Sequence, residues 1–149
     1  MVRPPRRLPP LRPRSVAEGS GVIEGDGYAV ALDLDALGDG YGFRKVRKEL
    51  GVTAFGVNVI TIPPGYETGK HLHEEQEELY FVHRGAIEMT FGDNTSHRIE
   101  EGGSARVDAS TVRQVKNAST SEDAVYLVAG GKDGYVGRDG KQPEDETKR

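Results

Sequence analysis

Hydrophobic and polar residues alternate with a period of two through much of the middle of the chain. Several short segments with this alternation are rich in β-branched or aromatic residues and are bounded by glycine, proline, asparagine or aspartate, which is typical of β-strands. In one of them, Ile87, Met89 and Phe91 are each separated by a single residue. The predicted strands are residues 28–34, 54–62, 78–83, 86–91 and 124–129.

One segment has helical spacing instead. Phe43, Val46 and Leu50 fall on one face of a helix over residues 43–50, and Gly51 follows as a stop signal. Turn signals at residues 63–65, 92–94 and 101–103 separate the strands by about 8 to 12 residues, without a strand–helix alternation. The pattern predicts an all-β sandwich or barrel with one short helix.

Length and charge divide the chain into three parts. Its 149 residues suit one domain. The first fourteen residues hold five arginines, five prolines and no acid, and without these arginines the net charge of −4 becomes −9. We expect residues 1–20 to be a disordered, solvated extension; the alternative is an arm that binds RNA or acidic lipid. The domain is predicted over residues 21–131, and the glycine-rich, charged residues 132–149 are predicted to be a flexible polar tail.

Composition excludes several classes of function. The chain has no cysteine, which excludes disulfides, thiolate catalysis and cysteine-ligated metal centres. No run approaches the roughly 20 apolar residues of a transmembrane helix, and the first residues lack a secretory signal. The acidic domain argues against a nucleic-acid partner. We therefore expect a cytoplasmic protein with neither a membrane nor a nucleic-acid partner, in which nitrogen and oxygen atoms are the available metal ligands.

Two histidines and a glutamate stand out in this sequence. His71 and His73 are two residues apart, so on a strand their side chains point to the same face. Glu78 starts the next predicted strand, and a hairpin could bring its carboxylate beside both imidazoles. This ligand set suits Fe, Mn, Zn or Ni. The alternative is that the histidines lie on a polar surface strand followed by a solvated acidic turn.

The wider spacing resembles the first sequence motif of the cupin superfamily. That motif reads glycine, five residues, His-x-His, three or four residues, glutamate, six residues, glycine. Here its places are filled by Gly65, His71, His73, Glu78 and Gly85. The resemblance covers about residues 50–130 and implies a small single-domain protein with a double-stranded β-helix (jelly-roll) barrel, whose metal ligands are His71, His73 and Glu78.

The second cupin motif is only partly present. Gly102 and Asn117 are in register with it, whereas its proline, glycine and histidine are replaced by Asp108, Ser110 and Arg113. In the family that histidine is usually a fourth metal ligand. Arginine stays protonated and has no lone pair for a cation, so Arg113 cannot take this role.

Three positions are conceivable for the Arg113 side chain. It could form a bidentate pair with Glu78 and abolish the metal site, or it could reach past a three-ligand metal towards an anionic substrate. It could also point outwards at the rim of the barrel and extend to water. Tyr80, on the same strand face as Glu78, is either a hydrogen-bond donor to a ligand or a core aromatic residue.

The remaining candidates are expected to lie outside the site. His83 is one position out of phase with Tyr80, and His97 lies in a polar run, so both are predicted to be on the surface. Gln76 and Glu77 fall in the turn before Glu78. A carboxylate there could replace Glu78, but the spacing to the following glycine favours Glu78.

Two functions follow from these expectations. The first is a metalloenzyme that acts on a small polar or anionic organic molecule, with Arg113 and Tyr80 as candidate catalytic residues and Arg113 holding an anionic group. The resemblance implies a dioxygenase, an isomerase or epimerase, or a decarboxylase or lyase, without choosing among them. The second is a metal-free module that binds a small ligand. We also expect a homodimer, because the strand at residues 28–34 offers an exposed edge.

Overall fold

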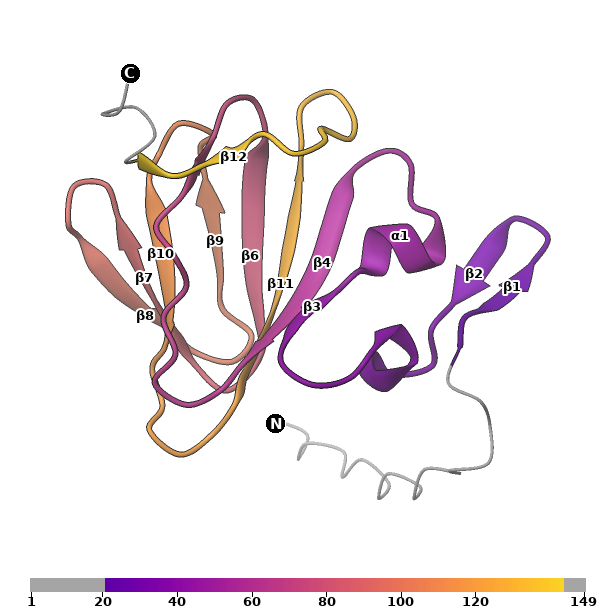
Figure 1. Ribbon diagram of the computed structural model, residues 1–149, viewed down its shortest axis with the longest axis horizontal. Helices are drawn as coiled ribbons and strands as arrows, with labels where there is room; N and C mark the ends of the chain where they lie inside the picture. Colours follow the sequence, from indigo (N-terminus) through magenta and orange to yellow (C-terminus); the bar gives the residue numbers. More distant parts are fainter. Residues whose placement is uncertain (1–20, 144–149) are drawn as a thin grey trace, which may run out of the picture.

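The alternating segments form two antiparallel sheets that enclose a shared core, as the computed structural model shows for residues 21–143 (Figure 1). Residues 1–20, where the extension was predicted, and residues 144–149 lie outside the described part. The larger sheet has the strand order β3 (Gly42–Arg44), β4 (Gly56–Ile62), β11 (Ala124–Gly131), β6 (Glu77–Arg84) and β9 (Ser104–Val107). The smaller has the order β10 (Arg113–Asn117), β7 (Ile87–Phe91) and β8 (Ser96–Ile99).

Two short strand pairs lie outside the two sheets. The strand β5 (Leu72–His73) pairs with β12 (Gly140–Lys141), and β1 (Ile23–Gly25) pairs with β2 (Tyr28–Val30). Isolated bridges join Glu67 to Lys116 and His71 to Arg113, so the segment leading into β5 runs along the free edge of β10. The all-β class is confirmed. Within residues 21–143, no helix is both long enough and apolar enough to cross a membrane.

Alternation along β6 decides which of its side chains face the core. The side chains of Glu78, Tyr80 and Val82 are buried, whereas those of Leu79 and Phe81 are exposed on the opposite face. The core takes residues from both sheets: Ile62, Tyr80, Val82, Ile87, Met89, Val107, Val115, Ala124 and Tyr126. Glu78 therefore points into the protein at the end of an otherwise apolar row.

The N-terminal region differs from the prediction. The strand expected over residues 28–34 ends at Val30, because Asp33 accepts a hydrogen bond from the amide of Ala36 (2.9 Å) and caps the 3-10 helix η1 (Leu34–Leu37). The predicted helix is shorter, α1 (Val46–Leu50). Phe43 belongs instead to β3, opposite Ile60 of β4, and is 62% exposed. Backbone pairing with β4 thus prevails over the helical spacing.

The C-terminal region is more ordered than predicted. Residues 132–141, which we call the strap, fold back across the end of the sheets, where β12 pairs with β5 (Figure 1). Asp139 in the strap is only 8% exposed. Residues 132–141, predicted to be a flexible polar tail, therefore pack against the domain that was predicted to end at residue 131.

Asn117, one of the two residues in register with the second motif, has a structural role. Its buried amide donates to the carbonyl oxygens of Ile62 (3.1 Å) and Glu122 (2.8 Å), and its side-chain oxygen accepts from the amide of Ser119 (2.9 Å). Each of these bonds satisfies a polar group next to the core. Asn117 thereby fixes the loop between β10 and β11 against the end of β4.

Candidate metal centre

His73 is the most constrained of the three predicted ligands. Its side chain is buried on β5, and its Nδ1 lies 2.8 Å from Oδ1 of Asp139. A proton on Nδ1 in this bond leaves the lone pair on Nε2, the tautomer that can bind a cation. Nε2 is buried, lies 3.1 Å from Oε1 of Glu78, and has no hydrogen-bond partner. It is therefore available for an ion.

The carboxylates of Glu78 and Asp139 lie next to the imidazole of His73 and favour its protonated, positively charged form. Burial opposes protonation, but Glu78 and Asp139 outweigh it and raise the pKa of His73. The same argument applies to Glu78, where burial disfavours the charged form but His73, Tyr80 and Arg113 hold the pKa of the carboxyl group below its ordinary value. An ionised glutamate beside a buried imidazole is a favourable place for a cation.

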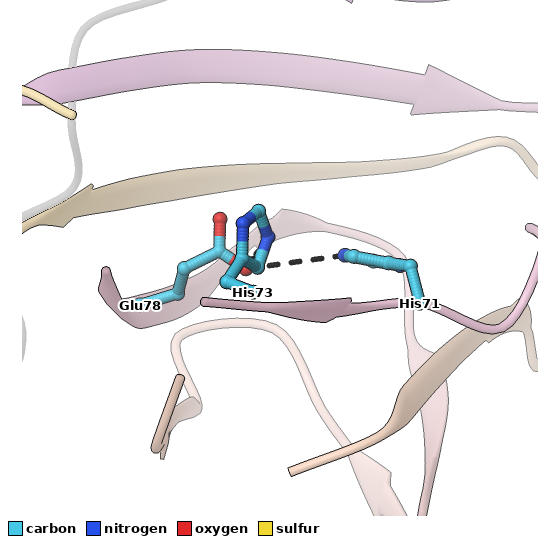
Figure 2. Close-up of side chains that lie close together, drawn as sticks. All are labelled: His71, His73 and Glu78. Atoms are coloured by element: carbon cyan, nitrogen blue, oxygen red, sulfur yellow. Dashed lines mark ion pairs between the residues drawn. The ribbon is translucent and has the colours of Figure 1, made fainter. Parts of the chain in front are cut away.

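His71 completes the group. Its Nε2 lies 4.0 Å from Oε1 of Glu78, and its ring is 5.3 Å from that of His73, at 84° to it. Figure 2 shows His71 directed towards the other two side chains. Burial, followed by the positive charge of Arg113, lowers the pKa of His71 and favours the neutral form, which is the form that binds metals.

The three side chains fit a divalent metal. One ligand atom from each lies within 4.8 Å of the other two. Ligand atoms about 2.1 Å from one ion can be up to about 4.2 Å apart, so small side-chain adjustments suffice. Two imidazoles and one carboxylate suit Fe, Mn, Zn or Ni. The unpartnered Nε2 of His73 supports the same conclusion, and the structure brings together the three ligands predicted from the sequence.

Asp139 was missed in the sequence. Besides His73, its carboxylate accepts from the backbone amides of Glu75 (2.9 Å) and Gln76 (3.0 Å), and from the side-chain amide of Gln76 (2.7 Å). Burial opposes its charge, but these amide donors and His73 hold the pKa of Asp139 well below its usual range. It orients His73 and fixes the turn before Glu78. Nothing in the local sequence signals this, because Asp139 lies in a charged, glycine-rich segment 66 residues from His73.

Arg113 is buried, with no exposed surface. Its guanidinium donates to the carbonyl oxygens of Ala109 (3.1 Å), Thr111 (2.9 Å) and Asp108 (3.2 Å). Its Nη2 is 3.6 Å from Oε1 of Glu78, an ion pair without a hydrogen bond. The outward position is therefore wrong, and so is the bidentate pair with Glu78. With its Nη atoms held by carbonyl groups, Arg113 is poorly placed to grip a substrate anion.

The other predicted residues take clear positions. Tyr80 is both a core residue, stacked on Tyr126 with ring centroids 6.1 Å apart, and a donor, since its hydroxyl group bonds Oε1 of Glu78 at 2.9 Å. Burial, followed by the charge of Glu78, raises the pKa of Tyr80 far above its ordinary value, so the hydroxyl group stays protonated. His83 and His97 are exposed, as predicted. Glu77 is exposed and pairs with Arg106, so it does not replace Glu78.

A cavity of about 1060 Å³ opens next to the three ligands. His71, His73 and Glu78 all line it, with Tyr80 beside them. Apolar side chains of β4 and β11, among them Ile60, Val128 and Tyr126, form one part of its wall. A small organic molecule could therefore enter and meet the ligand group, as in many enzyme sites.

Comparisons with known proteins agree with this architecture. A family model described as a cupin domain matches residues 58–130, which include all three ligands. A cupin protein from Bacteroides fragilis shares 21% identity and a TM-score of 0.55, over 64% of this chain and 78% of that protein. No curated protein matches the chain.

Two structurally similar proteins are described as enzymes. A sugar phosphate isomerase of the cupin superfamily from Silicibacter pomeroyi shares 24% identity over 72% of this chain and 60% of its own, with a TM-score of 0.55. DMSP lyase DddQ from Ruegeria pomeroyi shares 18% over 62% of this chain and 45% of its own, with a TM-score of 0.54. The chain thus spans less than two thirds of either enzyme. At these identities the similarity is one of fold, and the predicted double-stranded β-helix is confirmed.

Proposed function

We propose that this chain, which belongs to the cupin superfamily, binds a divalent transition metal through His71, His73 and Glu78 and acts on a small polar or anionic organic molecule. The observation that carries the proposal is the state of His73. Its Nδ1 is tied to Asp139, while its buried Nε2 has no hydrogen-bond partner and lies among the other ligand atoms. A buried polar atom is rarely left in this way without a function.

Each residue has a distinct part in this site. His71 and His73 would supply nitrogen ligands in their neutral form, so an ion that binds His73 displaces the proton that its raised pKa favours. Glu78 would supply the negative charge that balances part of the ion's charge. Tyr80 donates to Glu78 and fixes its orientation. A bound metal would supply Lewis-acid polarisation of substrate oxygen atoms. Apolar side chains of β4 and β11 in the cavity wall offer packing contacts to the carbon atoms of a bound molecule.

The metal proposal is tested on the full chain purified without a histidine tag. After incubation with Mn²⁺, Fe²⁺, Zn²⁺ or Ni²⁺ and removal of free ion, metal content is measured by mass spectrometry. We expect about one ion per chain in the parent protein and a loss of most of it in His73→Ala. His83→Ala is the matched control, because it removes an exposed imidazole from β6, outside the ligand group. Equal metal content in the parent protein and His73→Ala contradicts the proposal.

A metal-free ligand-binding module is the second candidate. It is favoured by the permanent positive charge of Arg113, 3.6 Å from Glu78, which weakens the attraction of the site for a cation. If the parent protein binds no metal and Arg113→His does, this second function is the better one. If the parent protein binds metal and His73→Ala does not, the first proposal, a metal-dependent function, is supported.

A further inference from the structure

Positive side chains gather at the part of the cavity wall formed by α1 and the strap. Lys45, Arg47, Lys48 and Arg138 all line the cavity, and we call them the basic mouth. Glu78, one of the metal ligands, is the one carboxylate among the lining residues. The chain as a whole carries a net charge of −4, so this concentration of cations runs against its composition.

Among the surface cations of residues 21–143, the basic-mouth residues have no carboxylate partner, a property that they share with Lys70, Arg84 and Lys132. Arg98, Arg106, Lys116 and Lys141 each pair with a carboxylate. Within residues 21–143, no carboxylate lies within ion-pair distance of any of the four basic-mouth residues. Their charges are therefore available to a ligand.

Two distant segments come together to form the basic mouth. The guanidinium of Arg47 in α1 lies 4.0 Å from the ring centroid of Tyr135 in the strap. Arg138 follows three residues later and directly precedes Asp139, whose bonds to His73 and the turn at residues 75–76 fix the strap. One short segment thus contributes to the metal centre and to the basic mouth.

We propose that the basic mouth binds the phosphate group of a small organic substrate whose other end reaches the metal centre. The inference rests on the proposed function for the identity of that second end. Guanidinium groups bind phosphate through paired hydrogen bonds. The two lysines add positive charge, so the basic mouth suits a doubly charged phosphate group better than a singly charged carboxylate group. A cavity of about 1060 Å³ has room for a molecule that spans both ends. The basic mouth thereby replaces Arg113 as the anion-binding group.

Calorimetric titration with inorganic phosphate tests the inference on the full chain, with and without bound metal. The test variant is Lys48→Gln/Arg138→Gln. The control is Arg98→Gln/Lys116→Gln, which removes the same charges from the smaller sheet, away from the cavity lining. We expect phosphate to bind the test variant about tenfold or more weakly than the parent protein, because charge-assisted hydrogen bonds are lost. The control should bind phosphate like the parent protein.

Three results would overturn the inference: no phosphate binding to the parent protein, equal binding to the parent protein and the test variant, or binding that needs the metal and ignores the test substitutions. Metal content measured on the same samples separates this inference from the proposed function. If metal is retained and phosphate does not bind, the basic-mouth inference fails alone. If phosphate binding depends on the basic mouth but no metal binds, the proposed metal function fails and the anion site stands.

Discussion

His71 and Arg113 are direct antiparallel partners, since the amide of each donates to the carbonyl oxygen of the other at 3.0 and 2.9 Å. Residues paired in this way project their side chains to the same face of a sheet. Residue 113 therefore approaches the ligand group from the strand next to His71. The resemblance to the second cupin motif places a histidine at this position, where this chain has a charged arginine that offers no lone pair to an ion.

Arg113→His should increase metal affinity. The substitution takes away a positive charge 3.6 Å from Glu78 and offers a nitrogen ligand in its place. We expect a gain of about tenfold or more in the association constant for Mn²⁺ or Zn²⁺, measured by calorimetry. Arg113→Met is the control, because it removes the charge without adding a ligand. If both variants bind metal equally well, residue 113 affects the site through charge alone.

Asp139→Ala should weaken metal binding without removing a ligand. The carboxylate holds the Nδ1 side of His73 and so keeps the lone pair on Nε2. Loss of such a partner costs about 10- to 100-fold in metal affinity in comparable sites. Asp26→Ala, which removes an exposed carboxylate from the turn between β1 and β2, serves as the control. Thermal unfolding of the metal-free proteins distinguishes an effect on His73 from a loss of folded protein. Unchanged metal affinity in the folded variant would show that Asp139 does not orient His73.

The central strands could be predicted from local periodicity, and the three candidate ligands from periodicity together with the spacing that resembles the first cupin motif. The strand predicted at residues 78–83 is β6 with one residue added at each end, and its alternation correctly directs Glu78 inwards. His71 and His73 share a face for the same reason. These features need no knowledge of distant contacts.

The missed features all depend on contacts between distant residues. Strands such as β8 and β9 are short and mostly polar, so they have little hydrophobic pattern, and their partners β7 and β6 define them. Asp139 acquires its role only when the strap returns to β5. Phe43 follows helical spacing, yet the edge of β4 draws it into a strand. In each case the stabilising contacts are made with a residue or strand that is distant in the sequence, so the local sequence does not reveal them.

Core packing predicts that Met89 and Leu79, on two strands that follow each other in the chain, contribute very differently to the free energy of unfolding. Met89 on β7 has no exposed surface and packs in the shared core, whereas Leu79 on β6 is 46% exposed on the outer face. Met89→Ala should lower the free energy of unfolding by about 2–5 kcal/mol, through lost burial and a residual cavity. Leu79→Ala should cost less than about 1 kcal/mol. Urea unfolding followed by circular dichroism measures both, and similar losses would contradict the assignment of the two faces.

Gly85→Ala should be more destabilising than Gly102→Ala, although both glycines have a left-handed backbone conformation, with φ of +76° and +85°. A Cβ atom at Gly85 would lie 2.6 Å from the carbonyl oxygen of Asp123, whereas one at Gly102 meets no atom within 4 Å. Gly102→Ala therefore incurs the left-handed conformational cost of about 1–2 kcal/mol, and Gly85→Ala adds a backbone clash to a similar cost. Urea unfolding of the two variants tests the order.

Gly85→Ala also tests whether a loss of stability at this turn affects metal binding. Gly85 follows the last residue of β6, at the opposite end of the strand from Glu78, so the strain of Gly85→Ala falls far along the strand from the ligands. We expect the folded fraction of Gly85→Ala to bind Mn²⁺ with the affinity of the parent protein, in contrast to Asp139→Ala. If Gly85→Ala loses metal affinity while folded, the left-handed turn also sets the position of Glu78, and the spacing from glutamate to glycine in the motif would serve the metal centre as well as the fold.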